Sequence, residues 1–110
     1  MDFQKPPVVV SRIADGFHLT FDGPIHVNTA WIEREFEKVV NQKPKLLELD
    51  LAGTEYISSM GLGILVGLHN RMKKDGGKVR VVKVKQKTFG ILKYAFLDKL
   101  FEIDPAGIVA

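Results

Sequence analysis

The residues of this chain best suited to chemistry are two adjacent serines, Ser58 and Ser59, within the sequence YISSMGLG at positions 56–63. An alternating apolar stretch precedes them and a mostly apolar run follows, so they lie where a strand gives way to a helix. The first turn of a helix has unpaired backbone N–H groups and a partial positive charge. A serine there can cap the helix, and a phosphate added to it would lie in a favourable field. Either serine is therefore a candidate phosphorylation site, with an ordinary helix N-cap as the simpler interpretation.

Little in the sequence supports catalysis. The chain has no cysteine, which excludes thiolate nucleophiles, disulfides and cysteine-ligated metals. Its three histidines, His18, His26 and His69, do not have the spacing of a metal site. His69 follows Ser59 on the same predicted helix by about 15 Å along the axis, so it cannot activate that serine. We therefore expect no enzyme activity, no metal and no cofactor.

The glycine-rich sequence GLGILVG at positions 61–67 is similar to a dinucleotide-binding fingerprint. Its third glycine comes one position too late, and the acidic residue expected about 20 positions later is not evident. The simpler interpretation is that glycines allow the start of this helix to lie close to the sheet.

The composition indicates one globular domain. The chain has 110 residues, of which 45% are hydrophobic and 26% charged, and its net charge is +3. Basic residues concentrate at positions 71–93, where nine lysines and arginines accompany a single acid, Asp75. Such a face suits electrostatic steering toward a charged partner. Few aromatic residues are interleaved with these cations, so we do not expect a nucleic-acid partner.

The N-terminal sequence and the lengths of the apolar runs indicate where in the cell the protein is expected. No apolar run approaches the roughly 20 residues that span a bilayer, and the N-terminus has no basic segment followed by an apolar one. We therefore expect no membrane insertion and a cytoplasmic location, with which the lack of cysteine agrees. Residues 1–7, which include Pro6 and Pro7, are expected to form a flexible arm before a single domain at 8–110.

The first half of the chain predicts a hairpin, a helix and a strand. Residues 8–13 and 17–21 are rich in β-formers and are joined by Ala14-Asp15-Gly16, a strong hairpin signal. Apolar residues at helical spacing predict a helix that starts at Asn28 or Thr29 and ends near Val40. Leucines alternate with acidic residues at 45–51, which predicts the next strand.

The second half continues the alternation of helices and strands. The helix after Ser59 carries apolar residues on most sides, so we expect at least its first half to be deeply buried, and Gly76-Gly77 ends it. Residues 79–84 predict a strand. Residues 88–96 predict a helix with Phe89, Leu92 and Phe96 on one face, followed by a helical turn at 97–101 and an extended tail. The order β-β-α-β-α-β-α predicts an α/β fold, a mixed β-sheet of about four to five strands with helices packed on it. Parallel crossovers are expected between residues 45 and 84.

This order of elements, together with the segment at 58–63, resembles the STAS domain, the fold of bacterial anti-sigma factor antagonists. In that family a strand ends in Asp, Leu and a small residue, as at 49–53 here. An aromatic–hydrophobic pair follows, here Tyr56 and Ile57, and then an Asp-Ser-Ser/Ala-Gly-Leu-Gly loop that opens a helix. The resemblance covers roughly residues 8–103. Its further matches are Gly76-Gly77, the closing pattern at 91–103, and Gly23-Pro24-Ile25 with Thr29-Ala30.

The resemblance implies a regulatory binding protein without catalysis of its own. Such antagonists bind an anti-sigma factor that is also a serine kinase, and so free the sigma factor; the kinase phosphorylates a loop serine and a serine phosphatase reverses this. The matching residue is Ser59, where about −2 charges would release the partner. Whether the chain also forms a weak homodimer stays open. The implied partner-binding residues are Ser58, Ser59, Met60, Gly61, Gly23, Pro24, Ile25, His26 and Asn28.

Three positions depart from the family pattern. The acid before the phosphorylated serine is Ser58 here, the acid of the earlier loop is His26, and Met60 replaces a small residue. These changes alter the local field and the surface that a kinase would recognise. The alternative interpretation is a STAS scaffold or transporter-associated subunit that is not phosphorylated and in which Ser59 only caps the helix. The third interpretation is a small enzyme or nucleotide-binding domain.

Overall fold

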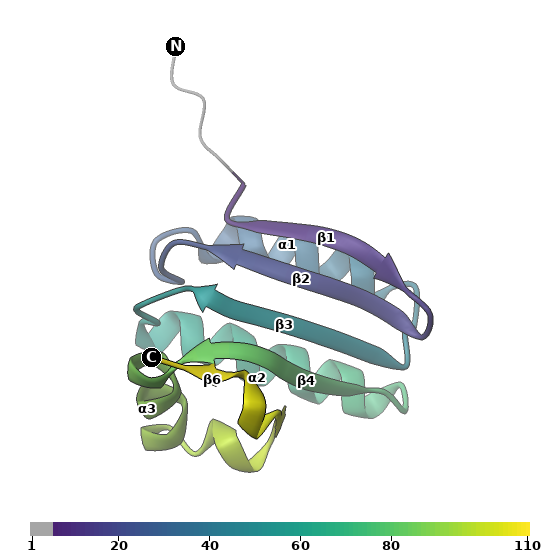
Figure 1. Cartoon of the computed structure of the whole chain (residues 1–110). Helices are drawn as coiled ribbons and strands as arrows, with labels where there is room; N and C mark the ends of the chain where they lie inside the picture. Colours follow the sequence, from purple (N-terminus) through teal and green to yellow (C-terminus); the bar gives the residue numbers. More distant parts are fainter. Residues whose placement is uncertain (1–5) are drawn as a thin grey trace.

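The protein folds as a mixed β-sheet with helices packed on it, as the sequence predicts (Figure 1). The computed structural model describes residues 6–110. No helix in this part of the chain is long and apolar enough to cross a bilayer. In chain order the elements are β1 (Val8–Ile13), β2 (Gly16–Asp22), α1 (Thr29–Val40), β3 (Leu46–Gly53), α2 (Ser59–Lys74), β4 (Lys78–Lys85), α3 (Gln86–Tyr94), the 3-10 helix η1 (Leu97–Lys99), β5 (Glu102–Ile103), the 3-10 helix η2 (Pro105–Gly107) and β6 (Ile108–Val109).

The sheet has the strand order β1-β2-β3-β4-β5, and β6 also pairs with β4. The first two strands form the predicted antiparallel hairpin, whereas β2, β3 and β4 run parallel to one another. Helices α1 and α2 lie side by side behind the sheet in Figure 1, and α3 lies at its end beyond β4. Because parallel neighbours end at the same edge, the loops that follow β2 and β3 are brought together there.

The N-terminal part of the hairpin is fixed by Pro7. Residues 1–5 of the predicted flexible arm lie outside the described residues. Pro7 itself is buried, and its carbonyl accepts a hydrogen bond of 3.0 Å from the backbone N–H of Asp22. The ordered domain therefore includes the last proline of that segment.

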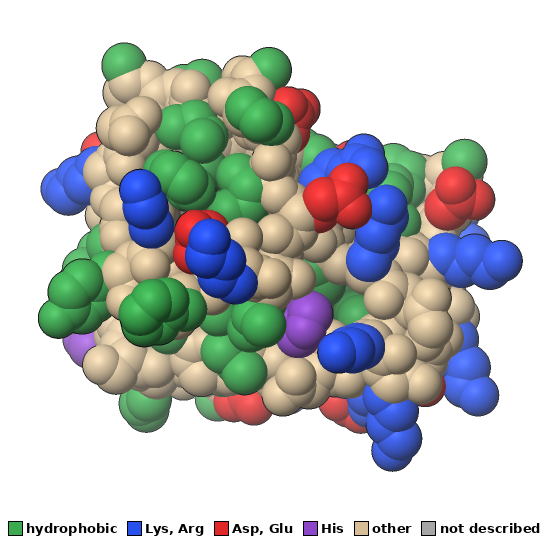
Figure 2. Space-filling model, turned by 90° about the horizontal axis from the view of Figure 1, so that it is seen from below, with side chains coloured by type: hydrophobic (Ala, Val, Ile, Leu, Met, Phe, Trp, Pro, Cys, Tyr) green, Lys and Arg blue, Asp and Glu red, His purple; other side chains and the backbone are tan. Residues whose placement is uncertain are grey.

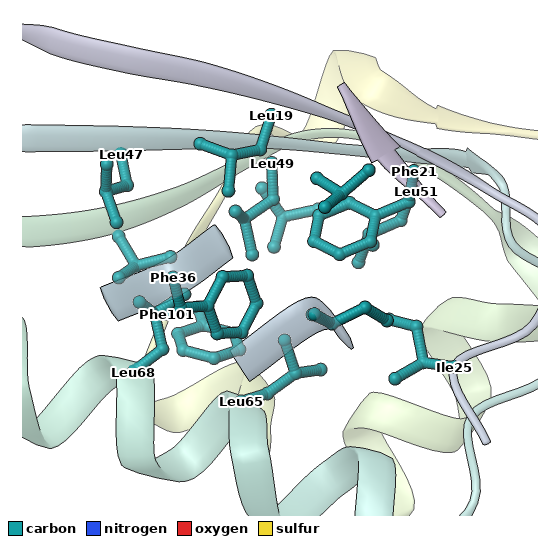
Figure 3. Close-up of a cluster of buried hydrophobic side chains, with 14 of the residues drawn as sticks. Leu19, Phe21, Ile25, Phe36, Leu47, Leu49, Leu51, Leu65, Leu68 and Phe101 are labelled. Carbon is teal, nitrogen blue, oxygen red and sulfur yellow. The ribbon is translucent and has the colours of Figure 1, made fainter. Parts of the chain in front are cut away.

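The core lies between the sheet and the helices (Figure 3). Leu47, Leu49 and Leu51 of β3 point inward and are fully buried, while the intervening Glu48 and Asp50 are half-buried. Each buried leucine stabilises the fold by about 1.5–3 kcal/mol relative to an exposed one. These side chains meet those from the other elements, namely Leu19 and Phe21 of β2, Phe36 of α1, Leu65 and Leu68 of α2, and Phe101.

An irregularity in β4 sets which of its valines reach the core. Leu49 pairs with Val81 but Asp50 pairs with Lys83, so Val82 is an extra residue on the β4 side. The buried valines are therefore Val79, Val81 and Val84 rather than a strictly alternating set. Gly107 lies directly against this bulge, since a Cβ there would come within 2.0 Å of the carbonyl oxygen of Val82. The bulge and the C-terminal segment are thus packed as one unit.

The prediction that the first half of α2 is deeply buried is wrong. Only one face of the helix is buried, through Gly61, Leu65, Leu68 and Met72, whereas Met60, Gly63 and Gly67 are exposed and the other residues between them are half-buried. The reason is the layer arrangement: α2 has the sheet on one side and α1 beside it, and within residues 6–110 no further layer covers its outer face. An open groove of about 590 Å³ runs between the two helices.

The predicted end of the last helix is also wrong. Helix α3 stops at Tyr94, and Phe96 has a left-handed backbone with φ of 63° instead of continuing the apolar face. The chain reverses there so that Leu97 can enter the core, and Phe96 is left 72% exposed. The tail is not merely extended but adds β5 and β6 to the edge of β4, which gives a six-stranded sheet.

Candidate functional site

The two serines at the start of α2 have different roles. Ser58 is the N-cap: its Oγ accepts a hydrogen bond of 3.1 Å from the backbone N–H of Gly61, and its side chain is buried, with 6% of the residue exposed. Its carbonyl accepts the first helical bond, 2.8 Å from the N–H of Leu62. Ser59 is the first residue of the helix and is exposed. Since Ser58 supplies the cap, the interpretation that Ser59 only caps the helix is wrong.

The loop between β2 and α1 lies against this helix start. The backbone N–H of Ile25 donates to the carbonyl of Tyr56 at 3.0 Å, and the N–H of Ser58 donates to the carbonyl of Ile25 at 2.9 Å. Ile25 and Ile57 thereby form a parallel bridge. The two loops that follow β2 and β3 are consequently joined by main-chain hydrogen bonds, which fix the position of Ser59 relative to residues 23–28.

The loop is also held from within. Gly23 has a φ of +86°, a conformation that favours glycine, and its carbonyl accepts a hydrogen bond of 2.9 Å from the hydroxyl of Thr54. Asn28 precedes α1 as predicted, but its side chain does not cap that helix. Instead it donates to the carbonyl of Pro24 at 3.0 Å and accepts from the backbone N–H of His26 at 3.0 Å. Asn28 thus holds the shape of the loop.

The predicted partner-binding residues divide into a surface and its support. Ser59, Met60, Pro24 and His26 are exposed and can contact a partner directly. The other members are buried or half-buried: Ser58, Gly61 and Ile25 are buried, and Gly23 and Asn28 are half-buried. Ile25, at 1% exposed, positions this surface rather than forming it. We call the exposed group, with Val27 and Tyr56 described next, the Ser59 surface.

Two further exposed apolar residues complete this surface: Val27, which lies in the loop at 23–28 that was expected to contact a partner, and Tyr56, which was not expected to do so. Val27 is 89% exposed, and Tyr56 is exposed beside His26, with ring centroids 5.7 Å apart in an edge-to-face arrangement. Val27 lies between two residues that were predicted, and Tyr56 immediately precedes the loop. The signal that could have found Tyr56 is the parallel pairing of β2 and β3, which brings both loops to one edge of the sheet.

The electrostatics of the helix start favour an added anion. The first turn of α2 contains no acidic residue. The nearby carboxylate in the preceding loop, Glu55, is paired with Lys85 at 2.9 Å, and this hydrogen bond, with the charges of Lys85 and Lys87, lowers the pKa of Glu55 below its usual value. The partial positive charge of the helix N-terminus at Ser59 is therefore not offset within its own turn.

The glycine-rich run at 61–67 does not form a phosphate-binding loop, because all of it lies within α2. Gly61 is needed for close packing: a Cβ there would lie 2.6 Å from the carbonyl oxygen of Ile25 and 2.9 Å from a methyl group of Ile57. At Gly63 and Gly67 an added Cβ would meet nothing within 4 Å. Gly61 therefore permits close contact with the loops at Ile25 and Ile57 rather than with the strands of the sheet as expected, and the other two glycines line the groove beside α1.

The histidines are spread over separate environments. The Nδ1 atom of His18 lies 3.0 Å from Glu48, and the ring of His69 packs edge-to-face on Phe101 with centroids 6.0 Å apart. His26 packs on Tyr56 as described above. Across residues 6–110, no three histidine, aspartate or glutamate side chains are grouped closely enough to hold a metal ion.

Comparison with protein families decides what this arrangement is. The family model described as the STAS domain matches residues 8–106, nearly the whole chain. The chain belongs to the STAS domain family. In this STAS domain the segment that carried the resemblance is the N-terminus of α2, and the surface around it is formed by the exposed residues already described.

Solved structures agree with this assignment. A crystal structure of an anti-sigma factor antagonist from Mycobacterium paratuberculosis is 25% identical and has a TM-score of 0.76, covering 89% of this STAS domain and 84% of that chain. The anti-sigma factor antagonist SpoIIAA in its unphosphorylated form is 9% identical, with a TM-score of 0.75 over 88% of this chain and 87% of that one. The Bacillus cell fate determinant SpoIIAA in the phosphorylated form is 10% identical, with a TM-score of 0.69 over 88% and 90%. The predicted resemblance in fold to anti-sigma factor antagonists is confirmed.

Proposed function

We propose that this STAS domain is an anti-sigma factor antagonist that binds an anti-sigma factor with serine kinase activity and is released when Ser59 is phosphorylated. One observation carries the proposal: the buried Ser58 caps α2, so the exposed hydroxyl of Ser59 is not needed for the helix. In such a partner-switching cycle a serine phosphatase regenerates the binding form. The chain would act in the cytoplasm and have no catalytic activity of its own.

The chemistry of the switch follows from the position of Ser59. A phosphate there adds about −1.5 to −2 charges at the N-terminus of α2, where the helix dipole and free N–H groups stabilise an anion. The domain itself is therefore expected to stay folded after phosphorylation. Support comes from the protein of similar fold, SpoIIAA, whose structure has been determined in a phosphorylated form.

Release of the partner depends on what surrounds Ser59. Val27, Tyr56 and Met60 are exposed apolar side chains on the same surface, and apolar and aromatic groups are typical of the buried centre of an interface. A doubly charged group brought into such a centre must lose its hydration, and that cost opposes binding. The same surface would thus bind a partner when Ser59 is neutral and reject it when Ser59 is charged.

The first test maps phosphorylation directly. The protein is incubated with ATP and each anti-sigma-type serine kinase of the source organism, and modified peptides are identified by mass spectrometry. Modification is expected at Ser59 and should disappear in Ser59→Ala. The chain has only two other serines, Ser11 and the buried Ser58, which makes the assignment unambiguous.

The second test measures partner binding by calorimetry. Ser59→Asp should weaken binding of the anti-sigma factor by at least about tenfold, as for a charge buried without a partner. Ser11→Asp, which adds the same charge to an exposed position on β1, is the matched control and should bind like the wild type. If Ser59→Asp binds as tightly as Ser11→Asp, the charge switch is wrong and the domain is a binding module that phosphorylation does not control.

A further inference from the structure

The basic residues at 71–93 do not form one free surface. Several are paired with acids: Arg71 with Glu37 and Asp75, Lys78 and Arg80 with Glu102, and Lys85 with Glu55. Within residues 6–110, no ion pair involves the exposed Lys73, Lys74, Lys83, Lys87, Lys93 or Lys99. Of these, Lys93 and Lys99 lie at the end of α3 and in the turn that follows it. The only acid between Gln86 and Phe101 is Asp98, which is half-buried.

The same segment exposes large apolar side chains. Tyr94 is 90% exposed and Phe96 is 72% exposed, and Leu100 is exposed beside them in the sequence. The backbone N–H of Phe96 donates to the carbonyl of Lys93, and the N–H of Lys99 donates to the carbonyl of Phe96, so two successive turns place a lysine on either side of Phe96. We call this group the α3 tip; its members are Lys93, Tyr94, Phe96, Lys99 and Leu100.

Phe96 is the left-handed residue that ends α3, a position that glycine usually fills. Its φ of 63° and ψ of 17° are unfavourable for an L-residue with a large side chain, whereas glycine adopts them freely. Its ring gains little from burial in this domain because it is exposed. The turn is therefore needed for folding but the phenylalanine is not, and its ring is free to contact a ligand.

We propose that the α3 tip docks onto an anionic lipid surface, with Phe96, Tyr94 and Leu100 entering the headgroup region and the lysines contacting lipid phosphates. Both cations of the tip are lysines, which act as point charges, whereas paired recognition of protein carboxylates favours arginine. Leu100 cannot stack on a nucleobase, which favours lipid over single-stranded nucleic acid. Aromatic residues next to lysines are typical of membrane-interface binding without insertion.

The position of the tip allows it to act independently of the Ser59 surface. The first turn of α3 is anchored beside the loop before α2, through the hydroxyl of Thr88, which donates to the carbonyl of Thr54. The tip lies at the other end of this helix, about 9 Å further along its axis from Thr88. Figure 2 looks at the molecule from below and shows hydrophobic side chains interspersed with basic and acidic ones.

Vesicle co-sedimentation tests the proposal with the whole chain and without any kinase or anti-sigma factor, so its outcome is independent of the proposed function. Wild-type protein should sediment with vesicles of phosphatidylglycerol and phosphatidylcholine, and binding should fall with added salt. Vesicles of phosphatidylcholine alone should bind much less protein. Lys93→Ala should weaken binding about fivefold, the contribution expected of one lysine near an anionic surface.

Phe96→Gly is the decisive variant because it removes the ring while relieving the left-handed backbone. It should lose most vesicle binding and yet unfold at a higher denaturant concentration than the wild type, which excludes misfolding as the cause. Lys74→Ala, with the same loss of charge on α2, and Val9→Ala, an exposed apolar residue of β1, should bind like the wild type. Equal binding of Phe96→Gly and wild type, or tip-dependent binding to single-stranded nucleic acid in preference to vesicles, would overturn the proposal.

Discussion

At the scale of single residues, the backbone conformation of Ser58 explains why the hydroxyls of Ser58 and Ser59 have different roles. Ser58 has an extended ψ of 171°, which turns its Oγ back onto the N–H of Gly61. Ser59 is already part of the helix, and it is exposed. The sequence predicted a cap and a phosphorylation site within this pair. Local chemistry could not decide which serine was the cap, because that depends on the exact residue at which the helix begins.

Exchanging each serine for alanine should therefore have different effects on stability. Ser58→Ala removes the cap and should lower the free energy of unfolding by about 1 kcal/mol. Ser59→Ala changes an exposed residue and should stay within about 0.5 kcal/mol of the wild type. Urea unfolding followed by circular dichroism measures both. Equal losses in the two variants would show that the capping bond is not made in solution.

Phe96 makes a second prediction at this scale. Phe96→Gly should raise the free energy of unfolding by about 0.5–1 kcal/mol. A left-handed backbone costs an L-residue about 1–2 kcal/mol, and glycine removes this cost. Part of the gain is offset because glycine loses more conformational entropy on folding. Gly76 is the reverse case, with a φ of +82° at the end of α2. Gly76→Ala should lower the free energy of unfolding by about 1 kcal/mol. The same urea titration measures both variants.

At the scale of elements, the start of α2 and the loop at 23–28 behave as one piece. Two main-chain hydrogen bonds and the Ile25–Ile57 bridge join them, and Gly61 permits their close contact. The positions of these loops therefore depend on the close packing of a glycine as well as on the hydrogen bonds of Asn28 and Thr54. A substitution that moves the loop at 23–28 away from the start of α2 should therefore disturb the Ser59 surface even though Ser59 itself is unchanged.

Two glycines of α2 provide a matched test of this packing. Gly61→Ala places a Cβ 2.6 Å from a backbone oxygen of Ile25 and should cost about 1–3 kcal/mol through overpacking. Gly63→Ala, two positions along the same helix, meets nothing within 4 Å and should stabilise the protein by about 0.5–1 kcal/mol. Thermal unfolding distinguishes the two. A loss of stability in Gly63→Ala would mean that the groove beside α1 is more closely packed than described.

Most elements were predictable because their apolar spacing is regular. The hairpin, α1, β3 and β4 were predicted within one or two residues, and α2 and α3 were predicted as helices, with α3 shifted by two residues. The bulge at Val82 could not be predicted, since the valine-rich run of β4 does not show where its pairing with β3 shifts. The short strands β5 and β6 likewise form only because β4 offers an open edge. The exposed outer face of α2 was missed because apolar content alone does not show how many layers a fold has.

At the scale of the whole molecule, the C-terminal segment is held to the sheet partly by charge. Glu102 of β5 contacts both Lys78 at 3.0 Å and Arg80 at 2.6 Å on β4. The hydrogen bonds from Lys78 and Arg80 lower the pKa of Glu102 below its usual value of 4.5. A carboxyl whose pKa is lowered on folding stabilises the folded state above its unfolded pKa, and that contribution is lost as the pH falls through the folded pKa.

Acid sensitivity should consequently depend on this side chain. The wild type should lose stability as the pH falls below about 4.5, the usual value for the carboxyl. In Glu102→Gln the neutral amide cannot be protonated, so stability should fall less steeply over the same range, while being slightly lower than that of the wild type at neutral pH. Urea unfolding midpoints across the pH series measure this. Parallel pH profiles for the two proteins would contradict the prediction.

At the start of α2 one serine caps the helix and the other is exposed, and this difference has an evolutionary consequence. Selection on Ser58 acts through folding, so its loss is felt in every setting in which the domain is made. Selection on Ser59 acts only through what the cell does with an accessible hydroxyl. Mutation of the single codon for Ser59 can therefore remove or restore an accessible hydroxyl at that position without changing the fold.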